Sequence, residues 1–117
     1  MQTSDIAVDL FDQLRASADQ ASQLMKAMAN TDRLMLLCQL SQGEKSVSEL
    51  EACLNLRQPS LSQQLTVLRE AQLVITRREG KNVYYSIGSP AALAVTRVLH
   101  DEFCQKEASP RLKSAQN

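Results

Sequence analysis

SVSELEACLNLRQPSLSQQLTVLR, residues 46–69, has the pattern of two short helices joined by a tight turn. In both halves, apolar side chains recur three or four positions apart, the spacing that keeps them on one face of a helix. These positions are Val47, Leu50 and Leu54 in the first half, and Leu61, Leu65 and Leu68 in the second. The stretch therefore predicts a helix-turn-helix at about residues 47–69.

Capping and turn residues mark both ends of the first predicted helix and the start of the second. Ser46 and Glu49 form an S-x-x-E capping box, in which each side chain satisfies a free backbone N–H of the first helix. Asn55 follows the last apolar position, where a terminating residue adopts the left-handed conformation that Asn tolerates. Pro59 suits the first turn of the second helix, because its missing N–H is not needed there.

The remaining face of the second helix is polar but mostly uncharged. A face that meets only water usually carries more Lys and Glu, whereas amides and hydroxyls can hydrogen-bond to base edges and phosphates in a major groove. We therefore interpret residues 59–69 as a recognition helix. Its candidate DNA-contacting residues are Gln58, Ser60, Ser62, Gln63, Gln64 and Thr66. The alternative is an ordinary pair of packed helices in a helical domain.

A β-hairpin is predicted directly after the recognition helix, at about residues 73–87. The segment LVITRR is β-branched and then basic, EGKN forms a turn, and VYYSI alternates again. A hairpin in this place is typical of a wing, which would neutralise the DNA backbone. The basic residues expected to do so are Arg69, Arg77, Arg78 and Lys81. The alternative is a solvated hairpin whose charges serve solubility.

Amphipathic helices are predicted on both sides of this unit. Apolar residues at helical spacing run from about residue 4 to residue 28 and predict one helix or two. Residues 31–40 are predicted to form a further helix. It is apolar nearly all round, so it should be the most buried element. Ser89 and Pro90 begin a last helix at about residues 90–106, whose apolar surface needs the N-terminal helix and a second subunit as partners.

The predicted fold class is mainly α with a small β-hairpin wing. It is a winged helix-turn-helix in a single domain, residues 1–106, and the N- and C-terminal helices form the dimer interface. Residues 107–117 are predicted to be a flexible tail.

Length, charge and cysteine content limit the function. The 117 residues suit one domain, and the formal net charge of zero argues mildly against a nucleic-acid partner. The charges are unevenly spread, however: residues 57–81 hold five basic and two acidic residues, and residues 1–26 hold two basic and four acidic ones. No signal peptide or membrane-length apolar run is visible, so we expect a cytoplasmic protein. Three widely spaced cysteines in that compartment are not a disulfide framework.

Together these elements resemble the ArsR/SmtB family of bacterial winged-helix repressors, over roughly residues 18–104. The most specific segments are LMKAMANTDRL at residues 24–34, RQPSLSQQLTVLREAQLV at 57–74 and RREGKNVYYSI at 77–87. The resemblance implies a homodimer that binds an imperfect palindrome in double-stranded operator DNA. It also implies that the protein blocks transcription until an inducer lowers its affinity for that DNA.

The founding members of the family bind metals or metalloids through a cysteine pair before the turn, in an ELCVCDL-like segment. Here the corresponding segment is EKSVSEL, with Ser46 and Ser48 at the thiol positions, and a serine hydroxyl is a poor ligand for soft metals. A second family site uses Asp and His pairs on the last helix, where His100 stands beside Asp101 and Glu102. Adjacent helical residues do not share a face, so we expect no metal site and no cofactor.

Two cysteines resemble those of the reactive-sulfur-sensing subgroup, the BigR-, SqrR-, YgaV- and HlyU-like proteins. The likeness rests on LMLLC, ending at Cys38, and on FC, ending at Cys104. It implies a reactive sulfur species as inducer: a persulfide forms on one thiol, the other attacks it, and a disulfide or polysulfide bridge links two helices, releasing genes for sulfide detoxification. Such a bridge needs the two sulfurs close together and a partly ionised thiol. Cys53 has no counterpart in that pattern and is interpreted as structural.

Other functions remain open on the sequence. Cys38 could be only a small buried hydrophobe, since free cysteine is often buried. The same thiols could respond to an oxidant, the inducer could be a metal, and the winged helix could bind a protein instead of DNA. An enzyme is not predicted, and no residue is proposed as catalytic, because the sequence has no Cys-x-x-Cys, no Gly-rich phosphate loop and no Cys–His pair beside an orienting acid.

Overall fold

The computed structural model describes the backbone of residues 2–105 and the side chains of residues 9–104. The elements follow in the order α1 (Gln2–Met28), α2 (Thr31–Leu40), β1 (Lys45–Ser46), α3 (Val47–Leu54), α4 (Gln58–Glu70), β2 (Val74–Glu79), β3 (Asn82–Ile87), α5 (Pro90–Leu99) and a π-helical turn (His100–Gln105). The predicted fold class is confirmed: the chain is mostly helical with one small antiparallel sheet. The predicted tail at residues 107–117 lies outside the described residues.

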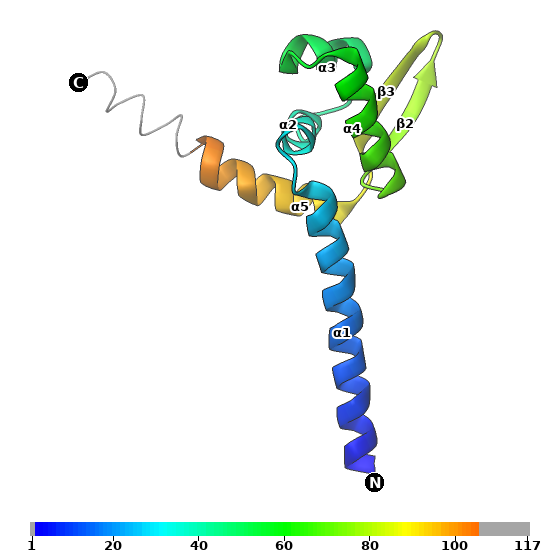
Figure 1. Cartoon of the computed structure of the whole chain (residues 1–117), viewed down its shortest axis with the longest axis vertical. Coiled ribbons are helices and arrows are strands. Elements are labelled where there is room, and N and C mark those ends of the chain that lie inside the picture. Colours follow the sequence, from blue (N-terminus) through cyan, green and yellow to red (C-terminus); the bar gives the residue numbers. More distant parts are fainter. Residues whose placement is uncertain (1, 106–117) are drawn as a thin grey trace, which may run out of the picture.

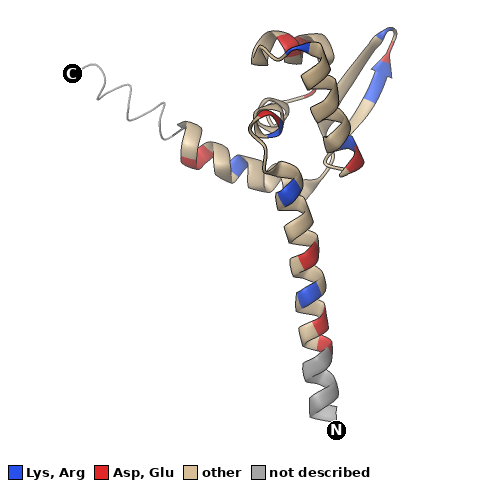
Figure 2. Cartoon of the chain, viewed as in Figure 1, with Lys and Arg blue, Asp and Glu red and all other residues tan. Residues whose placement is uncertain are grey.

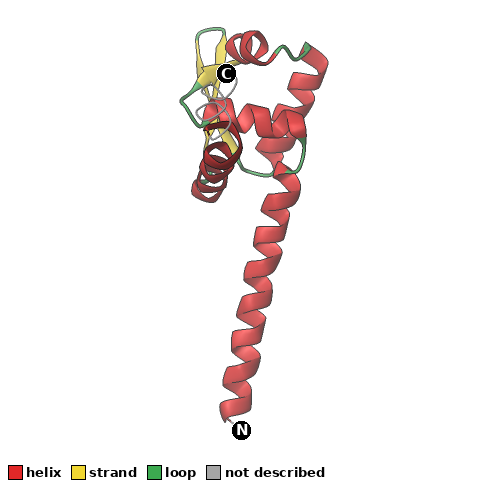
Figure 3. Cartoon of the chain, turned by 90° about the vertical axis from the view of Figure 1, so that its left-hand side faces the viewer, coloured by secondary structure: helices red, strands yellow, loops and turns green. Residues whose placement is uncertain are grey.

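The helices α2, α3 and α4 and the hairpin form one unit, and α1 and α5 leave it in different directions (Figure 1). The sequence left open whether the N-terminal region is one helix or two, and α1 is a single continuous helix. The side chains of residues 9–23 are all exposed, and contact with the core is made near the end of α1, by Leu24 and Met28. The rest of α1 projects away from the body (Figure 3). Its exposed apolar residues include Leu10 and Phe11.

The helix-turn-helix has the ends that the sequence predicts. At the start of α3, the Glu49 N–H donates to Ser46 Oγ at 3.2 Å and the Ser46 N–H donates to Glu49 Oε1 at 2.8 Å, so the capping box is complete. Asn55 ends α3 in the left-handed conformation, with φ 55°. Pro59 lies in the first turn of α4. The turn is therefore held by local interactions that the sequence specifies.

The core lies where α2, α3 and α4 meet the sheet and α5. The predicted apolar positions of the helix-turn-helix supply much of it, because one stripe of each helix faces inward. Its buried apolar residues are Met28, Leu36, Leu37, Leu40, Leu50, Leu61, Leu65, Leu68, Leu73, Val74, Tyr85 and Ala92. In α2, every residue from 34 to 40 is buried or half-buried, as the apolar composition of this helix predicts.

The predicted hairpin forms from β2 and β3, joined by Gly80 and Lys81. Gly80 has φ +64° at the first of these two turn positions, a conformation that glycine adopts without a Cβ clash. A third strand, β1, pairs with the other edge of β3 and gives the order β1-β3-β2. The sequence did not reveal β1, because a two-residue strand has no alternating pattern to detect.

The last helix departs from the prediction of one regular helix to about residue 106. Ser89 caps it, with its Oγ accepting from the Ala92 N–H at 3.1 Å. The α-helix ends at Leu99, and a π-helical turn continues the chain from His100 to Gln105. Apolar spacing cannot distinguish the two, because a single wider turn barely changes the pattern. No helix among residues 2–105 has the length and apolarity needed to cross a bilayer.

Candidate DNA-binding surface and cysteine pair

The polar face of α4 points away from the core. Leu61, Leu65 and Leu68 hold the opposite face inward and are all buried. The predicted DNA-contacting residues that α4 leaves exposed are Gln58, Ser60, Ser62, Gln63 and Thr66. The Thr66 hydroxyl donates to the Ser62 carbonyl at 2.9 Å, and its lone pairs remain available to accept. This face offers amides and hydroxyls, the groups that hydrogen-bond to base edges and phosphates.

Gln64 differs from the other predicted contacts. It is half-buried, and its Oε1 accepts a 2.8 Å hydrogen bond from Arg33 Nη1 of α2. The Nε of Arg33 also donates to the carbonyl of Ala27, in the last turn of α1. Arg33 could not be identified from the sequence alone, because the contact joins residues 31 positions apart on different helices.

The wing arginine Arg77 is exposed but is paired with other protein groups. Its Nε and Nη2 donate to the two carboxylate oxygens of Glu44, each at 2.8 Å, and its Nη1 donates to Glu79 at 2.7 Å. Its guanidinium also lies over the Tyr84 ring, 4.7 Å from the centroid. The hydrogen bond from Arg77 lowers the pKa of Glu44, and the same bond, followed by that to Glu79, raises the pKa of Arg77.

The other three predicted backbone-neutralising residues, Arg69, Arg78 and Lys81, are exposed. Within residues 9–104, none of them forms a salt bridge. Figure 2 shows basic residues on β2 toward the tip of the wing, and a separate basic residue near the C-terminal end of α4. Exposed cations on the wing and at the end of α4 are groups that a phosphate backbone attracts.

Cys38 and Cys104, distant in sequence, meet in the structure. Cys38 lies in α2 and is half-buried, and Cys104 lies in the π-helical turn and is exposed. Burial raises the pKa of the Cys38 thiol, and its interaction with the neighbouring Cys104 thiol raises it further. Both thiols are free. The structure thus brings together the two cysteines that the resemblance singled out.

The π-helical turn explains which side chain reaches α2. Leu99, the last residue of α5, packs against the core. In an α-helix, the residue four positions later, Phe103, would share its face, but a π-turn repeats after about five residues and brings Cys104 there. Phe103 is 65% exposed, and Cys104, although exposed itself, lies near enough to Cys38 to raise the pKa of that thiol. The extra residue in the turn therefore directs the thiol, and not the ring, toward Cys38.

The remaining candidate ligands are dispersed. Cys53 is exposed on α3, and Ser46 is buried as the helix cap. His100 is half-buried in the π-helical turn. Over residues 9–104, the structure contains no group of three or more His, Cys, Asp or Glu that could hold a metal ion.

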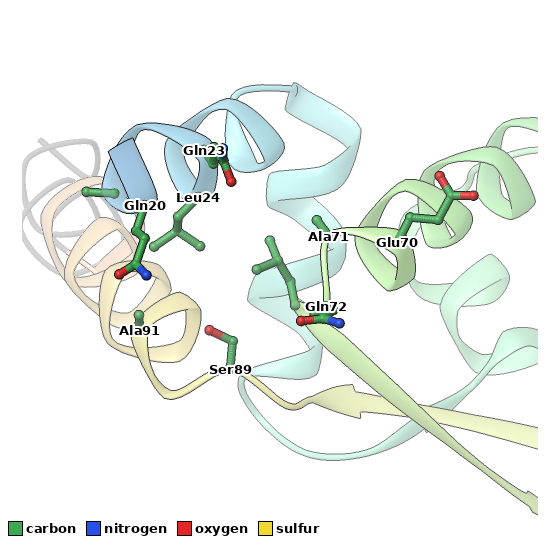
Figure 4. Close-up of a pocket in the computed structure, with 10 residues that line it drawn as sticks. Gln20, Gln23, Leu24, Glu70, Ala71, Gln72, Ser89 and Ala91 are labelled. Atoms are coloured by element: carbon green, nitrogen blue, oxygen red, sulfur yellow. The ribbon is translucent and has the colours of Figure 1, made fainter. Parts of the chain in front are cut away.

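An open hollow of about 720 Å³ lies between the C-terminal part of α1, the turn after α4 and the start of α5 (Figure 4). Gln20 and Leu24 line it from α1, and Gln72 and Ser89 border it from the connecting segments. The ten residues drawn around it include no cysteine or histidine, and Glu70 is their one charged group. This lining suits neither a soft metal nor a thiol reaction.

A hairpin packed directly behind the exposed helix of a helix-turn-helix distinguishes winged helix-turn-helix proteins from other helical domains, and this chain is one of them. Residues 30–76 match the family described as bacterial regulatory protein, arsR family. Over 90 residues the chain is 50% identical to the biofilm growth-associated repressor of Agrobacterium fabrum, covering 77% of each protein. It is 42% identical to the transcriptional activator HlyU of Vibrio cholerae, covering 80% of this chain and 86% of that protein. The chain belongs to the arsR family.

Solved structures of similar proteins have the same fold. Reduced HlyU from Vibrio cholerae matches with a TM-score of 0.76 and 41% identity, over 79% of this chain and 97% of that one. The repressor BigR from Xylella fastidiosa matches with a TM-score of 0.74 and 40% identity, over 80% and 95% of the two chains. A homodimeric winged helix-turn-helix domain from Mycobacterium bovis matches with a TM-score of 0.64 and 33% identity, over 80% and 89%.

Proposed function

We propose that this arsR-family protein is a DNA-binding transcriptional repressor whose operator affinity falls when a di- or polysulfide bridge joins Cys38 to Cys104. The observation that carries this proposal is the proximity of the two thiols: Cys104, in the turn after α5, lies near enough to Cys38 of α2 to raise the pKa of that thiol. A reactive sulfur species is the inducer, and the released genes serve its removal. The relatives from Agrobacterium and Xylella are named as repressors and HlyU as an activator, and we assign repression here.

DNA binding is supported by the exposed face of α4 and by the exposed cations on the wing and at the end of α4. Homodimerisation is supported by exposed apolar side chains on the two outer helices: Leu10 and Phe11 on α1, and Val98 and Phe103 at the end of the chain's last helix. A second copy would remove this apolar area from water. A two-fold dimer would present its recognition helices to half-sites about 34 Å apart, one turn of DNA.

The exposed thiol, Cys104, reacts first, because a donor can reach it and burial raises the pKa of Cys38. Its thiolate attacks the outer sulfur of a hydropersulfide, R–S–SH. The S–S bond breaks, RS⁻ leaves and takes up a proton, and Cys104 becomes a persulfide. The Cys38 thiolate then attacks the sulfur bonded to the Cys104 side chain, and hydrogen sulfide leaves. Two cysteine thiols are thereby oxidised to a disulfide, and the hydropersulfide is reduced to one thiol and one hydrogen sulfide.

Longer bridges form when both cysteines are persulfidated first. One persulfide then attacks the other, expels hydrogen sulfide and leaves a trisulfide, which retains one extra sulfur. Peroxide cannot supply that sulfur: it converts a thiol to a sulfenic acid, which the second thiol resolves to a plain disulfide with loss of water. Extra sulfur in the bridge therefore identifies a sulfur sensor, whereas a plain disulfide can form with either reagent.

The test combines intact mass with DNA titration. Reduced protein is treated with a hydropersulfide donor, or separately with peroxide, and each product is titrated against a duplex that the reduced protein selects from a random pool. After treatment with the donor, we expect a Cys38–Cys104 bridge that contains extra sulfur. We also expect the affinity of this product for DNA to be lower by about 5–150-fold, the usual range of allosteric coupling.

Cys53→Ser is the matched control and should respond fully, whereas Cys38→Ser and Cys104→Ser should keep their DNA affinity after treatment. If peroxide releases the protein from DNA and the hydropersulfide donor does not, the protein is an oxidant sensor. If the two single variants still respond, the thiol switch is wrong, and a metal or another small-molecule inducer would then be sought.

A further inference from the structure

Arg33 joins three helices through two hydrogen bonds. It lies in the first turn of α2, where its backbone N–H donates to the N-cap residue Asn30 at 3.1 Å. Its side chain donates to the Ala27 carbonyl at the end of α1 and to Gln64 of α4 at 2.8 Å. The Ala27 carbonyl is one of those that a helix end leaves without an intrahelical partner. Arg33 therefore connects the projecting helix, the helix that carries Cys38 and the recognition helix.

The chemistry of the two side chains sets the orientation of this contact. A guanidinium has only donors, so the amide of Gln64 must turn its oxygen to Arg33 and its NH₂ group away. Both residues are partly buried, where a charge-assisted hydrogen bond is stronger than in water and costly to leave unmade. Gln64 is therefore constrained by the protein interior, unlike its exposed neighbour Gln63.

We infer that Arg33 is a positioning residue that couples the cysteine pair to the recognition helix through Gln64, an inference that rests on the proposed thiol switch. Cys38 and Arg33 lie on the same ten-residue helix, which moves as a rigid unit when its far end is pulled by a bridge to Cys104. A shift of α2 against α4 stretches the Arg33–Gln64 hydrogen bond. The reduced state, with this bond made, holds α4 in the orientation that binds DNA.

The test compares DNA affinity in the reduced and bridged states for variants of this pair. Gln64→Met keeps the length of the side chain and removes the acceptor, and Gln63→Met makes the same change one residue away without touching Arg33. Both variants lower the absolute affinity if the amides meet DNA, so the readout is the ratio of the two dissociation constants. We expect the ratio to fall at least about fivefold in Gln64→Met and to stay at the wild-type value in Gln63→Met.

Arg33→Met should lower the ratio of dissociation constants as much as Gln64→Met does. The double variant that combines them should have a ratio no lower than that of either single variant, because both changes remove the same hydrogen bond. Gln64→Glu keeps an acceptor for Arg33 and should restore the ratio, an effect that loss of packing alone would not produce. For each variant, intact mass verifies that the bridge has formed, and a thermal melt verifies that the protein is folded. If the wild type switches and Gln64→Met switches equally, the coupling role is wrong while the thiol switch stands. If the wild type shows a ratio near one, the proposed function itself fails and the inference with it.

Discussion

Arg77 of the wing and Glu44, 33 residues before it, form a two-pronged salt bridge with both N–O distances at 2.8 Å. This geometry matches the planar guanidinium to the carboxylate. Because Glu44 directly precedes β1, the salt bridge ties the start of the helix-turn-helix to the wing. Arg77, which the sequence predicts to neutralise the DNA backbone, is thus paired within the protein, whereas Arg78 and Lys81 form no salt bridge among the described residues.

The salt dependence of DNA binding should separate these arginines. Arg78→Gln or Lys81→Gln should reduce the slope of log K against log salt by about one per subunit, the effect of losing one phosphate contact. Arg77→Gln should leave the slope within about half a unit of wild type, because its charge is already compensated. Glu44→Gln, which leaves Arg77 paired only with Glu79, should steepen it. If Arg77→Gln and Arg78→Gln reduce the slope equally, Arg77 contacts a phosphate in the complex, contrary to this prediction.

The rate of bridge formation should rise with pH. Burial raises the pKa of Cys38, and its interaction with the neighbouring Cys104 thiol raises it further. Its thiolate is therefore scarcer at neutral pH than that of an ordinary thiol, and attack by Cys38 on the Cys104 persulfide accelerates until the pH passes the Cys38 pKa. Acid-quenched mass spectrometry between about pH 6 and pH 10 measures this. A bridging rate that is flat or falling over that range would exclude Cys38 as the resolving thiol.

The π-helical turn makes the position of the thiol specific to one residue. In the paired variant Phe103→Cys with Cys104→Phe, the thiol moves to a side chain that points outward. Bridging to Cys38 should slow at least about tenfold, because a disulfide needs close and correctly directed Cβ atoms. The experiment is run in a Cys53→Ser background so that the only other thiol is Cys38. Wild-type bridging by the swapped protein would mean that the turn relaxes to regular helix and does not direct the thiol.

Asn55 should be replaceable by glycine but not by alanine. Its φ of 55° lies in the left-handed region, where a Cβ costs about 1 kcal/mol or more for residues other than Asn and Gly. Asn55→Ala should therefore lower the free energy of unfolding by about 1 kcal/mol, and Asn55→Gly should change it by less than about 0.5 kcal/mol. Urea unfolding at one fixed protein concentration measures both, since dimerisation makes stability concentration-dependent. Equal losses for the two variants would place the cost in the Asn side chain and not in the backbone.

The sequence by itself determined the elements whose causes are local. The capping box at Ser46, the left-handed Asn55 and the apolar spacing of Leu61, Leu65 and Leu68 each act within a few residues, so they could be read directly and were confirmed. The hairpin was equally predictable, because its alternation and its Gly-containing turn are adjacent in the chain. The strand β1 was not, since it exists only as a partner of β3.

Tertiary structure alone decided which side chains are free to act. The sequence could not show that Cys38 meets Cys104, that Arg77 is paired with Glu44, or that Gln64 is held by Arg33. Each of these contacts joins residues far apart in the chain, so its existence depends on how helices and sheet pack against one another. A side chain's type determines the chemistry it can perform, but the packing around it determines whether that chemistry is available to DNA, to a sulfur donor or only to another part of the protein.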